Sequence, residues 1–217
     1  MGDPNGVGPE ICFAALSQNL QTPAILVIVG EWSLLKLAAQ NKNQKLVMVQ
    51  ISAIEEAVSP NAVYVWNGGF PFEGELKAGQ VCEKAGLASI SWVKAAVLAI
   101  QNNQADAMVT APICKESIEQ SIPGFQGHTE YIGEMCGDPE PVLTLIHGDW
   151  VVSHVSTHVS LREACNRVQI PRIKKTTKLL YSLLKDLNPG KEPKIGMAGL
   201  NPHAGENGTI GDEEQKF

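Results

Sequence analysis

The stretch Ala24-Ile-Leu-Val-Ile-Val-Gly30 is a continuous apolar run, and a helical pattern over residues 31–40 follows it directly. A short apolar run that ends at glycine is typical of a buried strand. The same alternation continues through the first half of the chain, with further strands predicted at residues 45–50, 62–66 and 107–109 and further helices at residues 9–20 and 79–101. Strands that alternate with helices predict an α/β fold, with a mostly parallel sheet covered on both faces.

The second half of the chain combines a hairpin pattern with helices. The elements predicted there are strands at 142–146, 150–155 and 193–198, a turn at 147–149, and helices at 131–136, from 161 onward, and at 170–187. A linker rich in Gly and Pro at residues 122–127 predicts a change of domain near residue 120. We therefore expect a first α/β domain over residues 1–120 and a second over residues 121–217.

Composition argues against several classes of protein. The net charge is −6 and no basic block occurs, whereas nucleic-acid binding favours a basic stripe. The apolar runs are too short to span a bilayer, and no secretory leader is recognisable at the start. The five cysteines form no Cys-x-x-Cys pair and stand in apolar surroundings, which predicts reduced cysteines in the core. Together these features predict a cytoplasmic protein.

Three histidines stand in loops at the edges of predicted elements: His128, His158 and His203. The loop around His203, Gly199-Leu-Asn-Pro-His-Ala-Gly-Glu-Asn-Gly208, follows the predicted strand at 193–198 and surrounds one imidazole with small residues. Histidine is the commonest metal ligand, and an open set of two or three would form a catalytic Lewis-acid site. The alternative is a tight surface turn with an incidental histidine, and the spacing alone leaves both interpretations open.

Three segments are candidates for binding an anion. The glycine-rich opening Met1-Gly-Asp-Pro-Asn-Gly-Val-Gly-Pro-Glu10 leads into a helix, a setting that suits either an anion or a simple turn. Lys115 follows the end of a predicted strand. It is either a contact for an anionic group of the substrate or a solvated helix residue. His128 precedes Thr129 at a helix N-terminus, which attracts anions; in the alternative interpretation Thr129 only caps the helix and His128 is exposed.

Five motifs occur together in an order that is specific. They are Met1-Gly-Asp-Pro-Asn-Gly-Val-Gly-Pro-Glu10, Val109-Thr-Ala-Pro-Ile-Cys-Lys115, Gly127-His-Thr-Glu-Tyr131, Thr157-His-Val-Ser-Leu161 and Gly199-Leu-Asn-Pro-His-Ala-Gly-Glu-Asn-Gly208. Over its whole length the chain resembles the 4-hydroxythreonine-4-phosphate dehydrogenase family of vitamin B6 biosynthesis. The resemblance implies an isocitrate/isopropylmalate dehydrogenase-like fold, with two α/β domains, the active site in the cleft between them, and a homodimer that shares the site.

The resemblance also implies a reaction and a set of site residues. The reaction is the NAD- or NADP-linked oxidation of 4-phosphooxy-L-threonine at its C3 hydroxyl, followed by decarboxylation to 3-amino-2-oxopropyl phosphate, in pyridoxal phosphate biosynthesis. By motif match, His158 and His203 correspond to metal ligands, for zinc, magnesium or cobalt. His128 and Thr129 correspond to substrate-binding residues, and Lys115 is a further candidate. No catalytic base and no NAD-binding residue is assigned from the sequence.

Two departures from the family pattern affect the expected activity. The strand that precedes Met-Gly-Asp-Pro in the family is missing, and the chain stops at Phe217, before the third metal histidine and several substrate contacts. We therefore expect this 217-residue chain to have little or no activity. The alternatives are a sibling dehydrogenase acting on 4-phosphoerythronate or 4-phosphothreonate, an enzyme like the phosphate acyltransferases, and an inactive binding or dimerisation module.

Overall fold

The computed structural model describes residues 1–17, 23–40, 46–138 and 140–216, and the chain divides into two compact units, Met1–Glu140 and Pro141–Phe217. The elements of the first unit are α1 (Gly8–Leu16), β1 (Leu26–Val29), α2 (Trp32–Ala39), β2 (Met48–Ile51), the 3-10 turn η1 (Ile54–Glu56), β3 (Val63–Trp66), α3 (Glu83–Gln101), α4 (Lys115–Glu119) and α5 (His128–Met135). Those of the second are β4 (Thr144–His147), β5 (Trp150–Ser153), α6 (Leu161–Arg167), α7 (Ile170–Leu187) and the 3-10 turns η2 (Pro202–Gly208) and η3 (Glu213–Gln215). Within the described residues, no helix combines the length and the apolarity needed to cross a membrane.

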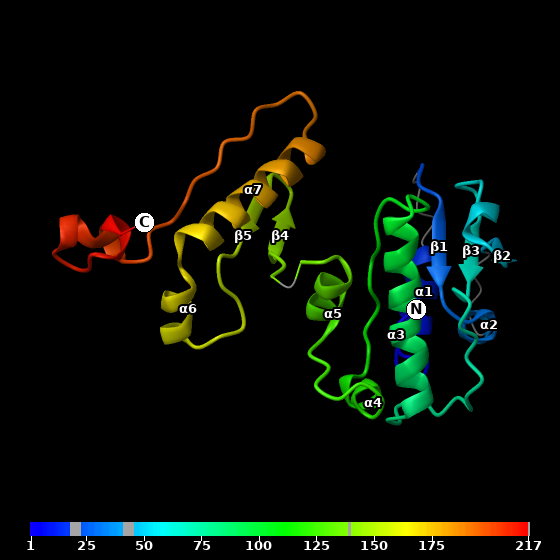
Figure 1. The fold of residues 1–217 in the computed structure, drawn as a ribbon. Helices are drawn as coiled ribbons and strands as arrows, with labels where there is room; N and C mark the ends of the chain where they lie inside the picture. Colours follow the sequence, from blue (N-terminus) through cyan, green and yellow to red (C-terminus); the bar gives the residue numbers. More distant parts are fainter. Residues whose placement is uncertain (18–22, 41–45, 139, 217) are drawn as a thin grey trace. The chain divides into compact units, whose positions relative to one another are not determined.

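The first unit is built on a parallel sheet in the order β1-β3-β2, as the alternation of strands and helices predicts (Figure 1). Val63 of β3 lies opposite both Leu26 and Met48, so the strand last in sequence is central in the sheet. Parallel strands need a long crossover, and α2 supplies the one between β1 and β2.

Successive side chains of these strands point to opposite faces, and helices cover both faces. On one face, Ile28, Val63 and Val65 pack with Phe13 of α1 and Leu35 of α2. On the other face, Val29 packs against a second cluster of buried side chains.

That second cluster includes Ala88 and Trp92 of α3. The Trp92 indole donates a hydrogen bond to the Phe70 carbonyl at 2.9 Å, which satisfies its polar atom inside the core. The prediction that both faces are covered is therefore confirmed.

The long helix α3 also holds α4 in place. Gly86 of α3 lies directly against the backbone of Ser117 and Ile118, and both of these residues are fully buried. A side chain at Gly86 would occupy the space that the α4 backbone fills. This contact fixes the position of Lys115, the first residue of α4.

The second unit contains the predicted hairpin and the two predicted helices. β4 and β5 pair antiparallel, and Gly148 takes a φ of 56° in the turn between them. α7 runs from Ile170 to Leu187, the range the sequence predicts. Arg172 of α7 donates hydrogen bonds to the carbonyls of Val155 and Pro141, which join this helix to both ends of the hairpin.

Two predicted strands are wrong. Residues 107–109 form no strand, and the Val109 side chain is 99% exposed. Residues 193–198 likewise form no strand, and Met197 is 64% exposed. A strand needs a neighbour for its N–H and C=O groups, and neither segment pairs with another strand among the described residues.

Three further predictions concern the cysteines, the ends of two predicted elements and the domain boundary. The prediction that the cysteines lie in the core is wrong for Cys136 and Cys165, which are exposed. Cys82 and Cys114 are half-buried, and the half-buried Cys12 packs against the core of the first unit. All five are free thiols. The expected extension of the first helix to Leu20, and the strand start at Lys45, lie outside the described residues. The domain boundary after residue 120 stays a prediction, while the compact units divide after Glu140.

We predict that Gly86→Ala lowers the free energy of unfolding by at least about 1 kcal/mol, because overpacking against the α4 backbone outweighs the gain in helix propensity. Urea denaturation followed by circular dichroism measures the change. Gly196→Ala is the control, because no described atom beyond its two chain neighbours lies within 4 Å of the added methyl group. Equal stability of the two variants would contradict the packing described for α3 and α4.

Candidate functional site

The glycine-rich opening of the chain is held by its own polar side chains. Asp3 and Asn5 are 6% and 3% exposed, and the Asn5 N–H donates to Asp3 Oδ1 at 2.9 Å. The Asn5 carboxamide accepts from the Lys77 N–H and donates to the Gln80 carbonyl. Burial raises the pKa of the Asp3 carboxyl, against the lowering effect of the hydrogen bond from Asn5. The hydrogen bonds of Asp3 and Asn5 therefore hold the conformation of the opening loop.

This opening loop lies directly against the loop that precedes α4. The Asp3 N–H donates to the Pro112 carbonyl at 2.9 Å, and Gly2 packs on the backbone of Ala111 and Pro112. Gly2 has a φ of 77°, and a side chain there would collide with that backbone. The structure thus brings the first two sequence motifs side by side within the first unit.

Lys115 and the start of α5 also come together. A Cβ placed on Gly127 would lie 3.5 Å from Lys115 Nζ and 3.3 Å from Glu130 Oε2. Gly127 is the N-cap of α5, with φ 154° and ψ −174°, a region that essentially only glycine occupies. The ammonium of Lys115 therefore stands at a helix N-terminus, where both the backbone N–H groups and the charge favour an anion.

His128 is the first residue of α5 and is half-buried, while Thr129 is exposed. The Nε2 atom of His128 is buried and has no hydrogen-bond partner among the described residues. The interpretation of Thr129 as the helix cap is wrong, because the N-cap is Gly127 and no side chain caps the helix. A buried imidazole nitrogen without a partner is a position at which a bound molecule would complete the hydrogen bonding.

Burial lowers the pKa of His128, and the positive charge on the Met1 amino group lowers it further. The imidazole is therefore neutral near pH 7, with one nitrogen as donor and the other as acceptor.

His158 and His203 lie in the second unit, and both are exposed. His158 stands between β5 and α6, and its φ is 55°. His203 stands in η2 with a φ of 54°, and its side chain is 74% exposed. Positive φ is uncommon for residues other than glycine and costs roughly 1–2 kcal/mol for each. Such strain is concentrated at functional sites, which favours a role for both loops.

The turn that carries His203 is left-handed over five consecutive residues. The φ values are 54° for His203, 51° for Ala204, 77° for Gly205, 44° for Glu206 and 56° for Asn207. In this turn Glu206 Oε1 lies 4.0 Å from His203 Nδ1.

Sequence reasoning missed the residues that hold this turn. The Asn201 N–H donates to Glu214 Oε1 at 2.6 Å, and Asn201 Nδ2 donates to Glu214 Oε2 at 2.9 Å and to Glu213 Oε2 at 2.6 Å. These bonds from Asn201 lower the pKa of the Glu214 carboxyl. The only signal in the sequence was an asparagine before proline, with two adjacent carboxylates a short distance beyond.

The donor chemistry of His158 and His203 fits a divalent cation, since two exposed imidazoles leave coordination positions open. Across the ranges that the structure describes, no three His, Cys, Asp or Glu side chains are grouped to hold one metal ion.

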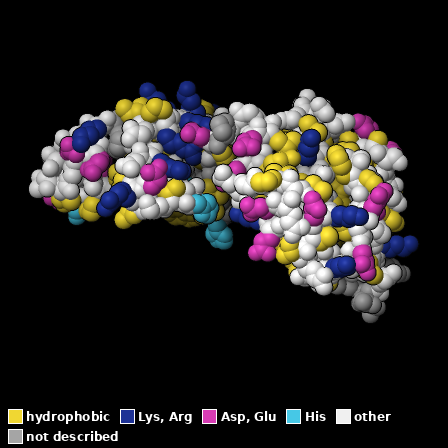
Figure 2. Space-filling model, turned by 60° about the horizontal axis from the view of Figure 1, so that its bottom comes forward, with side chains coloured by type: hydrophobic (Ala, Val, Ile, Leu, Met, Phe, Trp, Pro, Cys, Tyr) yellow, Lys and Arg dark blue, Asp and Glu magenta, His cyan; other side chains and the backbone are white. Residues whose placement is uncertain are grey.

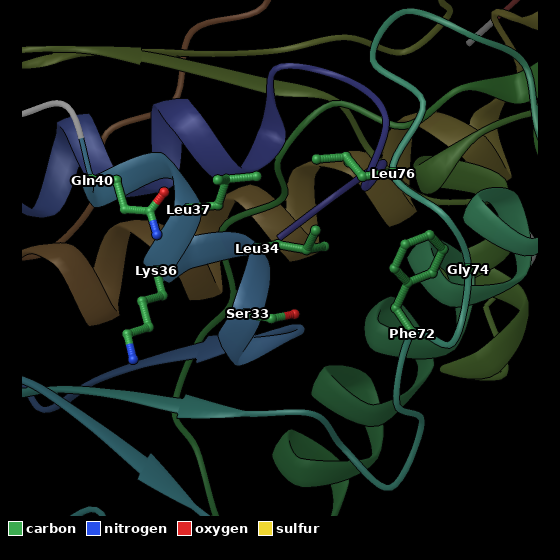
Figure 3. A pocket seen from close by; sticks show the side chains of 8 residues that line it. All are labelled: Ser33, Leu34, Lys36, Leu37, Gln40, Phe72, Gly74 and Leu76. Carbon is green, nitrogen blue, oxygen red and sulfur yellow. The ribbon is translucent and has the colours of Figure 1, made fainter.

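Two further features are the distribution of charged side chains on the surface and a pocket in the first unit. On the face drawn in Figure 2, acidic and basic side chains are interspersed, and histidine side chains reach the surface. A pocket of about 440 Å³ lies between α2 and the segment around Phe72, and Ser33, Lys36 and Gln40 supply its polar groups (Figure 3). None of the predicted site residues lines this pocket.

Comparison with known proteins identifies relatives. The family described as pyridoxal phosphate biosynthetic protein PdxA matches residues 21–217. The D-threonate 4-phosphate dehydrogenase of Salmonella typhimurium is 34% identical over 100% of this chain and 67% of the relative. The 4-hydroxythreonine-4-phosphate dehydrogenase of Sulfurihydrogenibium sp. is 30% identical over 100% of this chain and 66% of the relative.

A solved structure shows the same fold. The crystal structure of 4-hydroxythreonine-4-phosphate dehydrogenase from Klebsiella pneumoniae superposes with a TM-score of 0.88 at 30% identity, over 100% of this chain and 66% of that one. The chain thus spans about two thirds of the length of these relatives. The match over residues 21–217, together with these identities, shows that the chain belongs to the PdxA family.

Proposed function

We propose that the protein is a dehydrogenase that oxidises a phosphorylated four-carbon hydroxy acid. The hydroxyl-bearing carbon gives a hydride to NAD or NADP, and the hydroxyl oxygen gives its proton to a base or to solvent. The resulting β-keto acid then loses carbon dioxide. The observation that carries the proposal is that the two histidines of the metal motifs, His158 and His203, both stand exposed in strained loops of a PdxA-family chain.

The proposed roles follow the chemistry of each group. His158 and His203 would hold a divalent metal, with zinc, magnesium and cobalt as candidates. When bound, such a metal supplies positive charge that stabilises a reacting oxygen. Lys115 and the N-terminus of α5 would bind an anionic end of the substrate, and His128 with Thr129 would orient it. The neutral imidazole of His128 is suited to this, because its buried Nε2 still needs a hydrogen-bond partner.

Two substrates remain candidates within this class. The motif resemblance implies 4-phosphooxy-L-threonine, which would give 3-amino-2-oxopropyl phosphate for pyridoxal phosphate synthesis. The relatives that are 34% identical act, by their names, on D-threonate 4-phosphate. That identity exceeds the 30% found with the 4-hydroxythreonine-4-phosphate dehydrogenase of Sulfurihydrogenibium sp., and it favours D-threonate 4-phosphate.

The proposal extends to the whole protein. It includes an isocitrate/isopropylmalate dehydrogenase-like arrangement of α/β domains, a cytoplasmic location and a homodimer. The hairpin supports the homodimer, because Leu145, Trp150 and Val152 expose 57%, 77% and 48% of their surface. Apolar groups exposed together in this way are typical of a surface that a partner covers.

We predict that His158→Ala and His203→Ala each weaken zinc binding at least about 100-fold, because loss of a ligand costs at least as much as loss of its supporting contacts. Isothermal titration calorimetry measures the affinity. His147→Ala is the matched control, since His147 is an exposed histidine at the end of β4. Unchanged zinc affinity in both ligand variants would refute the proposed metal site.

A substrate panel tests the proposed reaction. In a chain of the full length of its relatives, we expect NADH or NADPH formation with D-threonate 4-phosphate to exceed that with 4-phosphooxy-L-threonine at least about tenfold in kcat/KM, which is about 1.4 kcal/mol of transition-state binding. Absorbance of the reduced nicotinamide follows the reaction, and 4-phosphoerythronate is included for comparison. A preference for 4-phosphooxy-L-threonine would assign the protein to the pyridoxal phosphate route.

The environment of His128 predicts its titration. Burial disfavours the imidazolium, so nuclear magnetic resonance should give a pKa below the ordinary value of about 6.5 in the folded protein and near that value in urea. Because the folded state binds this proton more weakly, lowering the pH through the ordinary value favours unfolding. His128→Asn should reduce that pH dependence. A folded-state pKa at or above the ordinary value would contradict the burial of this ring.

A further inference from the structure

The left-handed turn at residues 203–207 must be held by contacts outside its own backbone. Four of its five residues are not glycine, and each has a φ between 44° and 56°. Such a turn persists only where the surroundings determine it. Backbone hydrogen bonds link the two ends of the turn to the residues beside it. The N–H of Ala204 donates to the Asn201 carbonyl, the N–H of Thr209 to the Glu206 carbonyl, and the N–H of Ile210 to the Gly205 carbonyl.

The strongest contacts from outside the turn come from η3. The Glu214 carboxylate accepts from the Asn201 backbone N–H at 2.6 Å through Oε1 and from Asn201 Nδ2 at 2.9 Å through Oε2. It therefore binds both the backbone and the side chain of the residue two positions before His203. Glu213 accepts only from the side chain, at 2.6 Å. Hydrogen bonds to a charged carboxylate are shorter and stronger than those between neutral groups.

Two glycines leave room for the Glu214 carboxylate, and a third leaves room for the Asn201 side chain that it binds. A Cβ on Gly199 would lie 3.3 Å from Glu214 Oε1, and a Cβ on Gly205 would lie 3.2 Å from Glu214 Oε2. A Cβ on Gly211 would lie 2.6 Å from Asn201 Nδ2. The turn and η3 are thus packed closely around the contact between Asn201 and Glu214, with no space for side chains at these glycines.

We propose that Glu214 is a positioning residue, which fixes the left-handed turn through Asn201 and so sets the direction in which the His203 imidazole leaves the chain. The consequence for metal binding rests on the proposed function, whereas the effect on the turn does not. The turn also keeps the Glu206 carboxylate on the Nδ1 side of His203, at 4.0 Å.

The central test is Glu214→Gln in the protein. The amide keeps the size of the side chain but replaces one acceptor oxygen by a donor, which faces the donors of Asn201. We expect amide hydrogen exchange at Ala204, Thr209 and Ile210 to accelerate at least about tenfold. We also expect zinc affinity by calorimetry to fall about 10- to 100-fold, as for loss of a supporting contact at a metal ligand.

Two further variants sharpen the test. Asp212→Asn is the matched control, because this neighbouring carboxylate pairs with Lys216 at 2.6 Å and, within the described residues, makes no hydrogen bond to the turn. Neither exchange nor zinc affinity should therefore change. Asn201→Ala removes only the side-chain donor and keeps the backbone bond to Glu214, so its effect should be smaller. If circular dichroism shows that Glu214→Gln folds poorly, Asn201→Ala still tests whether the contact with Glu214 holds the turn.

The outcomes separate this inference from the proposed function. Unchanged exchange in Glu214→Gln overturns the role of Glu214. Faster exchange with wild-type zinc affinity also overturns it as a positioning residue, provided that His203→Ala loses zinc. If His203→Ala binds zinc as tightly as the wild type, the proposed metal site fails instead, and faster exchange in Glu214→Gln still supports the control of the turn.

Discussion

The pairing of β3 with both β1 and β2 is the interaction on which the first unit depends. A parallel sheet is stable only when apolar elements cover both of its faces, and here α1 and α2 cover one face while α3 covers the other. The covering helix then positions the next elements along the chain. Gly86 allows α4 to pack directly on α3, and this contact places Lys115 beside Gly127 at the start of α5.

A second constraint acts in the loops, where the backbone takes conformations that cost free energy. Gly2 and Gly127 allow close approaches that other residues would block. His158 and His203 adopt left-handed conformations without that freedom. In our proposal, the hydrogen bonds between Asn201 and Glu214 maintain this conformation at His203 by charge-assisted bonds instead of apolar packing. The position of His203 then depends on local polar contacts more than on a core.

The contrast between correct and incorrect predictions follows from how each element is stabilised. The helix over 170–187 is visible in the sequence because its backbone hydrogen bonds are internal and its buried side chains repeat at helical spacing. The segments 107–109 and 193–198 have strand-like composition as well, but a strand is completed by another segment. Neither finds a partner in the described parts of the chain, and Val109 and Met197 are exposed. In the candidate site, motif order singled out the histidines, whose role as metal ligands stays a prediction, but it gave no sign of the contact between Asn201 and Glu214.

The sequence by itself determined the α/β class, the parallel sheet, the order of the helices and the family, because periodicity and motif order are local properties that survive without coordinates. Only the tertiary structure decided that β3 is central, that Lys115 lies beside Gly127, that His128 has a buried nitrogen without a partner, and that Glu214 holds Asn201. The physical reason is that each of these depends on the distance in space between residues that are separate in the chain. Burial, hydrogen bonding and backbone strain are all set by such distances.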